Sequence, residues 1–184
     1  MIEVSGFEGL TIGPVTADLS RAAAEDHWLE DETENRQQGF GKGPAGRAAA
    51  IEGLLATFER NSTEEDFGVL GAYFNGQPIG FAAIELNPDQ RLTDVYLYVA
   101  PAHRRQGIGT AVLSHLLELL YSNRTYRVEI EVLKMNKGAI EFLRKNGFTW
   151  ESTKKAAYWM DKDVFDVAHL RMLRPAWNEI KKED

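Results

Sequence analysis

The chain has 184 residues, a formal net charge of -7 and no cysteine. Its length is that of one domain, and the lack of cysteine excludes a disulfide framework and a cysteine-ligated zinc site. We find no basic leader before an apolar run and no apolar stretch of about 18 residues, so we expect a cytoplasmic protein without a membrane span. The acidic balance argues against nucleic-acid binding.

The N-terminal part of the chain alternates strand and helix signals. A short strand, LTIGPV, is followed by a helix from Thr16, a glycine-rich loop and a second helix over Arg47–Arg60. Two further strands, FGVLGAYF and QPIGFAAIEL, flank the dipeptide Asn75-Gly76. Because this dipeptide tolerates positive φ at both positions, the pattern predicts a tight hairpin.

A basic turn joins the central strand to the central helix. Residues 92–99, LTDVYLYV, are rich in β-branched and aromatic side chains, and residues 108–121 carry apolar side chains at helical spacing. Between them lies RRQGIGT, residues 104–110. A helix N-terminus offers unpaired N–H groups, and glycine lets an anion approach them, so the turn indicates a phosphate site. An ordinary turn with solvated arginines fits the same residues.

The C-terminal third continues the alternation. In the strand YRVEIEV, apolar residues alternate with Glu129 and Glu131, and Asn136 then caps a helix that Gly147 closes. Two strands follow, near residues 149–160 and 166–173, and we expect residues 175–184 to be a polar tail after a domain over 1–174. The order predicts a mixed α/β fold with about seven strands and about four helices, in which antiparallel strands precede at least one parallel pair.

Two nucleotide-binding motifs are excluded. The glycine pattern of a dinucleotide-binding turn would need a third glycine where this chain has Val112. In GKGPAGRA the spacing of Gly41 and Gly46 is that of a phosphate-binding loop of nucleotide hydrolases, but Arg47 and Ala48 replace the lysine and the hydroxyl residue.

Two blocks together resemble the GNAT superfamily of acyl-CoA-dependent N-acyltransferases. They are RRQGIG, residues 104–109, and NKGAIEFLRKNGF, residues 136–148, in an overall resemblance covering about residues 8–173. The resemblance implies a GNAT-like single domain with a splayed central strand pair, acetyl-CoA as co-substrate and no metal. It also implies transfer of an acetyl group to a primary amine of a small molecule or peptide. Within the superfamily the chain looks most like the branch acting on ribosomal-protein N-termini, polyamines and amino sugars.

The resemblance also assigns the cofactor residues. Backbone N–H groups of Arg105 to Thr110 would bind the diphosphate of coenzyme A, and the pantetheine arm would enter between residues 97–99 and 128–132. Asn136 matches an asparagine that contacts the cofactor, although a plain helix cap is equally compatible. The implied cofactor-binding residues are Leu97, Tyr98, Val99, Arg104, Arg105, Gln106, Gly107, Ile108, Gly109, Thr110 and Asn136.

Amide formation from a thioester requires a base for the amine proton. Glu131 matches a base position of N-terminal peptide acetyltransferases, or is simply a solvated strand carboxylate, and Asp94 is the second candidate. Many family members have a tyrosine where this chain has Leu143, so the proton donor to the leaving thiolate is either Tyr158 or solvent. His169 is expected to be a structural strand residue.

The acceptor and the assembly are less determined. Loop residues 37–46 and 158–163 are expected to contact the acceptor, and Asp26, Glu30 and Glu34 either face a cationic acceptor or form a solvated helix face. The alternatives to acetyl transfer are a larger acyl-CoA or a carrier-protein thioester as donor, or a non-catalytic acyl-CoA-binding module. Aromatic residues of the terminal segment suggest a homodimer; they are Tyr158, Trp159, Phe165 and Trp177.

Overall fold

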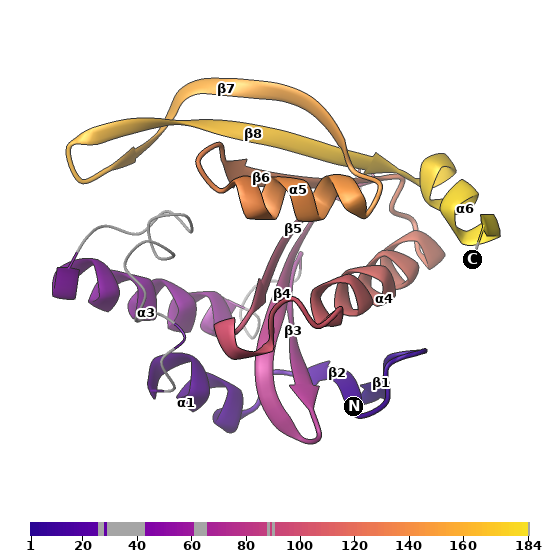
Figure 1. The fold of residues 1–184 in the computed structure, drawn as a ribbon, viewed down its shortest axis with the longest axis horizontal. Coiled ribbons are helices and arrows are strands. Elements are labelled where there is room, and N and C mark those ends of the chain that lie inside the picture. Colours follow the sequence, from indigo (N-terminus) through magenta and orange to yellow (C-terminus); the bar gives the residue numbers. More distant parts are fainter. Residues whose placement is uncertain (26–27, 29–42, 61–65, 88, 90, 184) are drawn as a thin grey trace.

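The protein folds around one mixed sheet of eight strands, ordered β1-β2-β3-β4-β5-β6-β8-β7 (Figure 1). The computed structural model describes residues 1–25, 28, 43–60, 66–87, 89 and 91–183. The strands are β1 (Ile2–Glu3), β2 (Leu10–Pro14), β3 (Phe67–Phe74), β4 (Gln77–Asn87), β5 (Leu92–Val99), β6 (Arg127–Leu133), β7 (Thr149–Met160) and β8 (Asp163–Leu173). The helices are α1 (Ala17–Glu25), α3 (Gly43–Arg60), α4 (Ile108–Ser122), α5 (Lys137–Lys145) and α6 (Arg174–Glu183), with a short 3₁₀ turn, η1 (Pro101–His103).

Strand pairing follows the order that the sequence predicted. Strands β2 to β5 form an antiparallel meander, and β5 and β6 pair in parallel through the α4 crossover. The β3–β4 turn places Asn75 at φ 49° and Gly76 at φ 79°, as expected for this dipeptide in a tight hairpin. Strands β6, β8 and β7 complete the sheet in antiparallel pairs.

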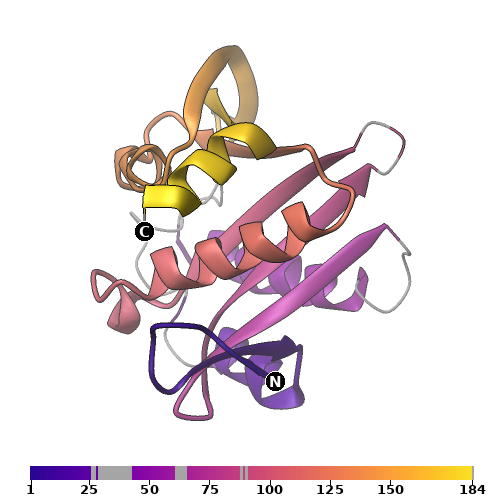
Figure 2. The same cartoon turned by 90° about the vertical axis from the view of Figure 1, so that its right-hand side faces the viewer.

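Helices cover the two faces of the sheet unequally. On one face, side chains of α4 and α5 pack on alternate residues of β4, β5, β6 and β8. On the other face, α1 and α3 pack on β3, β4 and β5 (Figure 2). The residues of β6 and β8 that point to this second face are mostly charged, and they include Arg127, Glu129, Glu131 and Arg171. The charged half of this face borders the site described below.

The structure adds elements that the sequence pattern did not show. A polar tail was expected over 175–184, but residues 174–183 form α6, whose Trp177 is only 7% exposed and packs beside Tyr121 with ring centroids 6.3 Å apart. Its composition is polar overall, but Trp177 and Ile180 lie one helical turn apart and face the core. Strand β1 has two residues, too few to show a periodicity. Among the described residues no helix has the length and apolar character needed to cross a membrane.

Candidate active site

The central strands β5 and β6 separate after three residue pairs. Their ladder joins Leu92–Asp94 to Arg127–Glu129 and ends there, whereas β5 stays paired with β4 as far as Val99. Every second residue of a strand points its N–H and C=O away from a given neighbour, so β5 beyond Asp94 presents backbone groups to an open gap. This is the splayed strand pair that the sequence resemblance implied.

The turn after β5 concentrates unpaired backbone donors. Arg105 at φ 60° and Gly107 at φ 84° reverse the chain before α4 begins at Ile108. Ala111 is the first residue of the turn's helix whose N–H is bonded, to the Gly107 carbonyl at 3.0 Å. The N–H groups of residues 105–110 donate to no group in the part of the chain that the structure describes. Such a nest at a helix N-terminus suits an anion.

The two polar side chains that flank Arg105 have structural contacts. Arg104 folds back on β5, where its Nε donates to the Val99 carbonyl at 2.5 Å and its guanidinium lies 5.3 Å from the centre of the Tyr98 ring. Gln106 donates from Nε2 to the Ala102 carbonyl at 3.0 Å. Arg104 is therefore not a freely solvated arginine, and both side chains hold the turn in shape.

A cavity of about 410 Å³, the turn cavity, opens beside these donors. It is lined by Leu97, Tyr98, Val99, Arg104, Arg105, Gly107, Gly109, Thr110, Asn136, Gly138, Ala139 and Phe142. Nine of the eleven residues expected to bind the cofactor are in this set. The other two are outside it, because Gln106 is exposed and Ile108 is 1% exposed in the core.

Glycine keeps the turn cavity open. A Cβ on Gly109 would come within 3.4 Å of the Phe142 ring, on the side where the cavity lies. Asn136 lies at the far wall and caps α5, since its Oδ1 accepts a hydrogen bond from the Ala139 N–H at 3.1 Å. Asn136 can therefore cap α5 and line the turn cavity at the same time, and the sequence had left both roles open.

A second cavity, the gap cavity, lies between the separated strands and has a volume of about 290 Å³. It shares Leu97, Asn136, Ala139 and Phe142 with the turn cavity. Glu131, Leu143 and Tyr158 are also in its wall. Leu143 is 3% exposed and Tyr158 is 38% exposed. Tyr158, the candidate proton donor, and Leu143, which replaces the family's tyrosine, therefore border the same cavity.

The third cavity, the acidic cavity, measures about 670 Å³ and lies between α3 and strands β4 to β6. Its wall holds four carboxylates, Glu85, Asp94, Glu129 and Glu131, and apolar side chains of β3 to β5. It shares Tyr96 and Glu131 with the gap cavity. The three cavities therefore adjoin in series, and Glu131 stands where the second meets the third.

The two base candidates differ in their surroundings. Glu131 forms an ion pair with Lys154 of β7, and both side chains are about half exposed. The carboxylate of Asp94 makes no hydrogen bond or ion pair with any described residue. Partial burial raises the pKa of the Asp94 carboxyl above its usual value, and the neighbouring Glu129, Glu85 and Glu131 add to this effect. Asp94 lines only the acidic cavity.

The other polar residues considered from sequence are wall or structural residues. Tyr98 is 2% exposed, and its hydroxyl donates to the Trp28 carbonyl at 2.5 Å. The ring of Tyr96 packs at a tilt against Phe81, with ring centroids 5.6 Å apart. Asp26, Glu30, Glu34 and loop residues 37–42, which were expected near the acceptor, lie outside the described residues.

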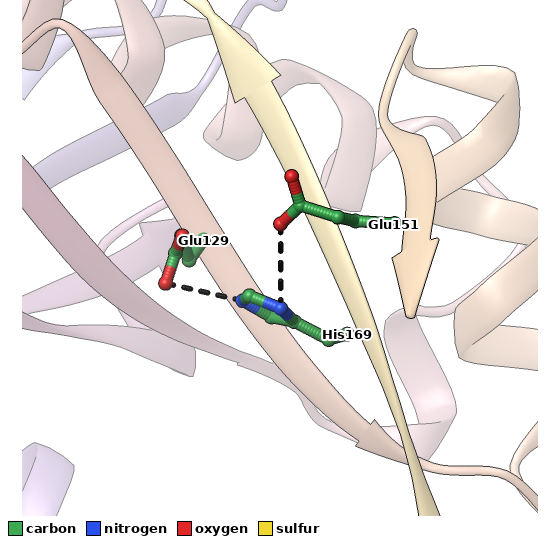
Figure 3. Close-up of side chains that lie close together, drawn as sticks. All are labelled: Glu129, Glu151 and His169. Carbon is green, nitrogen blue, oxygen red and sulfur yellow. Dashed lines mark ion pairs between the residues drawn. The ribbon is translucent and has the colours of Figure 1, made fainter. Parts of the chain in front are cut away.

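His169 lines none of the three cavities and belongs to a charged network on the open half of the sheet, which reaches the acidic cavity only through Glu129 (Figure 3). Its Nε2 is 3.1 Å from Glu129 Oε2, and its Nδ1 is 3.5 Å from Glu151 Oε2. Arg127 pairs with both glutamates, and Arg171 contacts Glu151 at 2.7 Å. Hydrogen bonds from Arg127 and then Arg171 lower the pKa of Glu151 to about 2.

The sequence pattern did not reveal this network. The carboxylates of Glu129 and Glu151 and the imidazole of His169 lie close enough together to hold a metal ion. Their carboxylates are already bonded to two guanidinium groups, so a cation there would have to displace or face two positive charges. The expectation that His169 is a structural strand residue fits its place in this network.

Comparison with known proteins identifies the family. The family model described as acetyltransferase (GNAT) family matches residues 23–148. The chain belongs to the GNAT family. An uncharacterised N-acetyltransferase of Methanocaldococcus jannaschii is 32% identical over 96 residues, which are 49% of this chain and 42% of that protein. N-alpha-acetyltransferase 50 of Danio rerio is 34% identical over 122 residues, 61% of this chain and 72% of that protein. The chain thus spans less than half of the archaeal relative.

Solved GNAT structures share the whole fold. A ribosomal-protein alpha-N-acetyltransferase in complex with coenzyme A superposes with a TM-score of 0.72 at 16% identity, covering 94% of this chain and 97% of that chain. A spermidine N-acetyltransferase from Vibrio cholerae, solved with coenzyme A and spermine, gives a TM-score of 0.72 at 13% identity, covering 94% and 99%. At such identities the likeness establishes the fold, and it confirms the predicted fold class.

Proposed function

We propose that this GNAT protein transfers an acetyl group from acetyl-CoA to a primary amine by direct attack on the thioester. One observation carries the proposal. A nest of unpaired backbone N–H groups, an open strand gap and a carboxylate-lined cavity adjoin in that order, so donor and acceptor can approach from opposite ends. The family match and the relatives, which are N-acetyltransferases, support the same reaction.

The residues of the turn fit the diphosphate of coenzyme A. The unpaired N–H groups of residues 105–110 at the start of α4 would bind its negative charge, and Arg105 adds a positive charge. The shared wall of the turn and gap cavities leaves a path for the pantetheine arm along β5. We propose that backbone N–H groups of β5 that face the gap stabilise negative charge on the thioester carbonyl oxygen.

Glu131 is proposed to accept the proton of the attacking amine. It stands at the junction of the gap and acidic cavities, and Lys154 holds its side chain there. As the nitrogen bonds to the acetyl carbon, the proton passes to the carboxylate and the carbon–sulfur bond breaks. Tyr158, in the wall of the gap cavity, is proposed to donate a proton to the departing thiolate. Asp94 is the next candidate for the base.

The decisive experiment measures release of the free thiol of coenzyme A from acetyl-CoA over a panel of primary amines. We expect amine-dependent release with formation of the acetylated amine, identified by mass spectrometry. A hexanoyl-CoA comparison distinguishes a larger acyl donor, which would then be the better substrate. If coenzyme A binds but no amine accelerates thiol release, the chain is a binding module.

Three further properties belong to the proposal. We propose a cytoplasmic location, because a chain without cysteine needs no oxidising compartment for folding. Fractionation of cells tests this location. The reaction is proposed to need no metal, so turnover should survive dialysis against a strong chelator.

A homodimer is proposed through the β7–β8 hairpin, where Trp159 is 69% exposed and Val164 is 52% exposed. Trp177, considered for this contact from sequence, is instead buried under α6 and takes no part. Light scattering should show a particle of twice the mass of the chain, and a monomer at high concentration would contradict the dimer.

A further inference from the structure

Three carboxylates stand in one row across neighbouring strands. Glu85 of β4 is in register with Asp94 of β5, and Asp94 is in register with Glu129 of β6. Residues in register on neighbouring strands point to the same face of a sheet, and like charges placed this way repel each other. Nothing in the fold of a sheet requires such a row. All three side chains line the acidic cavity.

The arginines near the row only partly neutralise it. Arg60 lies 3.8 Å from Glu85, and Arg127 contacts Glu129 from the side of the charged network, where the His169 ring also touches Glu129. Asp94, in the middle of the row, forms no direct ion pair with a described residue, although Lys154 and His169 lie close enough to act on its charge. The described wall of the cavity thus holds four carboxylates and one arginine.

The wall between the carboxylates is apolar and aromatic. Phe67, Phe81 and Tyr96 contribute to it. Glu129, the end of the row, and Glu131, at the junction with the gap cavity, lie two positions apart on β6. The row is therefore about 7 Å from Glu131 along the strand. A ligand that reaches both places carries one charged group at each and an aliphatic segment between them.

We infer that the acceptor is a small aliphatic amine with a second ammonium group, whose reacting nitrogen lies at Glu131 while the row Glu85–Asp94–Glu129 holds the second nitrogen. The inference rests on the proposed acetyl transfer, which assigns the acidic cavity to the acceptor. The cavity and its junction with the gap define the site, and the carboxylates define the charge that it selects.

Matched pairs of amines test the inference. The wild-type protein is assayed with putrescine against butylamine and with cadaverine against pentylamine, each pair having the same carbon chain. We expect kcat/KM to favour the diamine by about tenfold to a hundredfold, the effect of a charge-assisted hydrogen bond, beyond the statistical factor for two equivalent amines. The preference should shrink as salt is added. Equal kcat/KM values within each pair would overturn the inference while leaving acetyl transfer intact.

Variants of the row locate the effect. In Glu85→Gln, and more so in Glu85→Gln combined with Asp94→Asn, the ratio of diamine to monoamine kcat/KM should fall about tenfold. Glu118→Gln is the matched control, because Glu118 is an exposed carboxylate of α4 that lines none of the three cavities, and it should keep the wild-type ratio. A ratio that survives in the double variant would show that the row does not bind the second ammonium.

Equilibrium binding separates this inference from the proposed reaction. Calorimetric titration with putrescine, in the presence of coenzyme A, should show binding to the wild type that the double variant loses. Binding without turnover would refute the acetyltransferase and retain the dication site. Turnover of amines without this binding difference would do the reverse.

Discussion

The two ends of the β5–β6 gap use opposite means to attract opposite charges. At the turn cavity the attraction comes from backbone N–H groups that no described residue satisfies, with Arg105 beside them. At the acidic cavity it comes from side chains that project from regular strands. One strand, β5, reaches both ends, with Asp94 and Val99 about 17 Å apart along it. The net charge of the chain therefore says little about either end, because acidic and basic groups are separated in space.

The difference also decides which substitutions act at each end. A backbone nest is altered by changing a glycine, because a side chain blocks the approach to the N–H groups. A carboxylate row is altered by an isosteric amide, which removes charge and keeps shape. The turn end should therefore be sensitive to bulk, and the acidic end to charge.

The largest expected effect is at the junction of the two ends. Glu131→Gln should lower kcat by about 10² to 10⁴ at neutral pH, since it removes the proposed proton acceptor. The loss should shrink at high pH, where the amine deprotonates without help. Steady-state kinetics across pH, with titration of coenzyme A to confirm unchanged affinity, measure it. Turnover within about twofold of wild type would mean that Glu131 is a surface carboxylate and that Asp94 is the next base to test.

A bulky side chain in the glycine turn should weaken coenzyme A binding. Gly107→Val should weaken coenzyme A binding by about a hundredfold, because its N–H lies in the nest and its φ of 84° disfavours a branched side chain. Gly76→Val is the matched control. Gly76 has φ 79° and open space around it in the β3–β4 turn, so it bears the same backbone strain far from the cavity. If both variants bind coenzyme A with equal affinity in calorimetry, the nest is not the diphosphate site.

Local patterns in the sequence were enough to predict most of the elements at the turn end of the gap. The bounds predicted for β5 agree with the structure, and so does the Asn75-Gly76 turn, because strand composition and turn dipeptides act over a few residues. The glycine turn and the asparagine cap were visible for the same reason. The antiparallel strands and the parallel pair followed from the order of the elements, whereas the splayed pair was reached only through the resemblance to a known family.

The carboxylate row was beyond a reading of local patterns. Asp94 and Glu129 are 35 positions apart, and their register depends on how β6 docks after the α4 crossover. The same holds for the network of Glu129, Glu151 and His169, which joins three strands. Arg104 also differs from the solvated arginine that the sequence allowed, because its side chain folds back on Val99. No rule of residue spacing predicts this contact.

A smaller effect, on stability, tests whether the active site extends beyond the acidic cavity to Glu151. Glu151→Gln should lower the free energy of unfolding at pH 7 by about 1 kcal/mol, a discounted value for a partly exposed network, and leave turnover unchanged. The folded-state pKa of Glu151, about 2, is below the usual value of 4.5 for a glutamate, so its contribution is full above about pH 4.5 and is lost as the pH falls through about 2. Urea denaturation of both proteins at pH 7 and at pH 3 should show the difference shrinking. A loss of kcat would instead extend the active site into the network.

The smallest expected effect has the opposite sign. Asp94 has a raised folded-state pKa, so the folded protein binds the proton more tightly than the unfolded chain, and ionised Asp94 reduces stability at neutral pH. Asp94→Asn should therefore raise the free energy of unfolding at pH 7 by roughly 0.5 kcal/mol, the scale of like charges on neighbouring strands. This gain should fade as the pH drops through the raised pKa towards 3.8, because wild-type Asp94 is then protonated as well.

The sign of that change separates a binding role from a structural one. A carboxylate kept only for the fold would stabilise the protein, and its removal would lower the melting temperature at pH 7. A carboxylate kept for a cationic acceptor lowers stability until the ligand arrives, so putrescine should raise the melting temperature of the wild type more than that of Asp94→Asn. Thermal unfolding of both proteins with and without putrescine measures the two effects together. If Asp94→Asn is less stable than wild type at pH 7, the row is a structural feature, and the acidic end loses its part in selecting the acceptor.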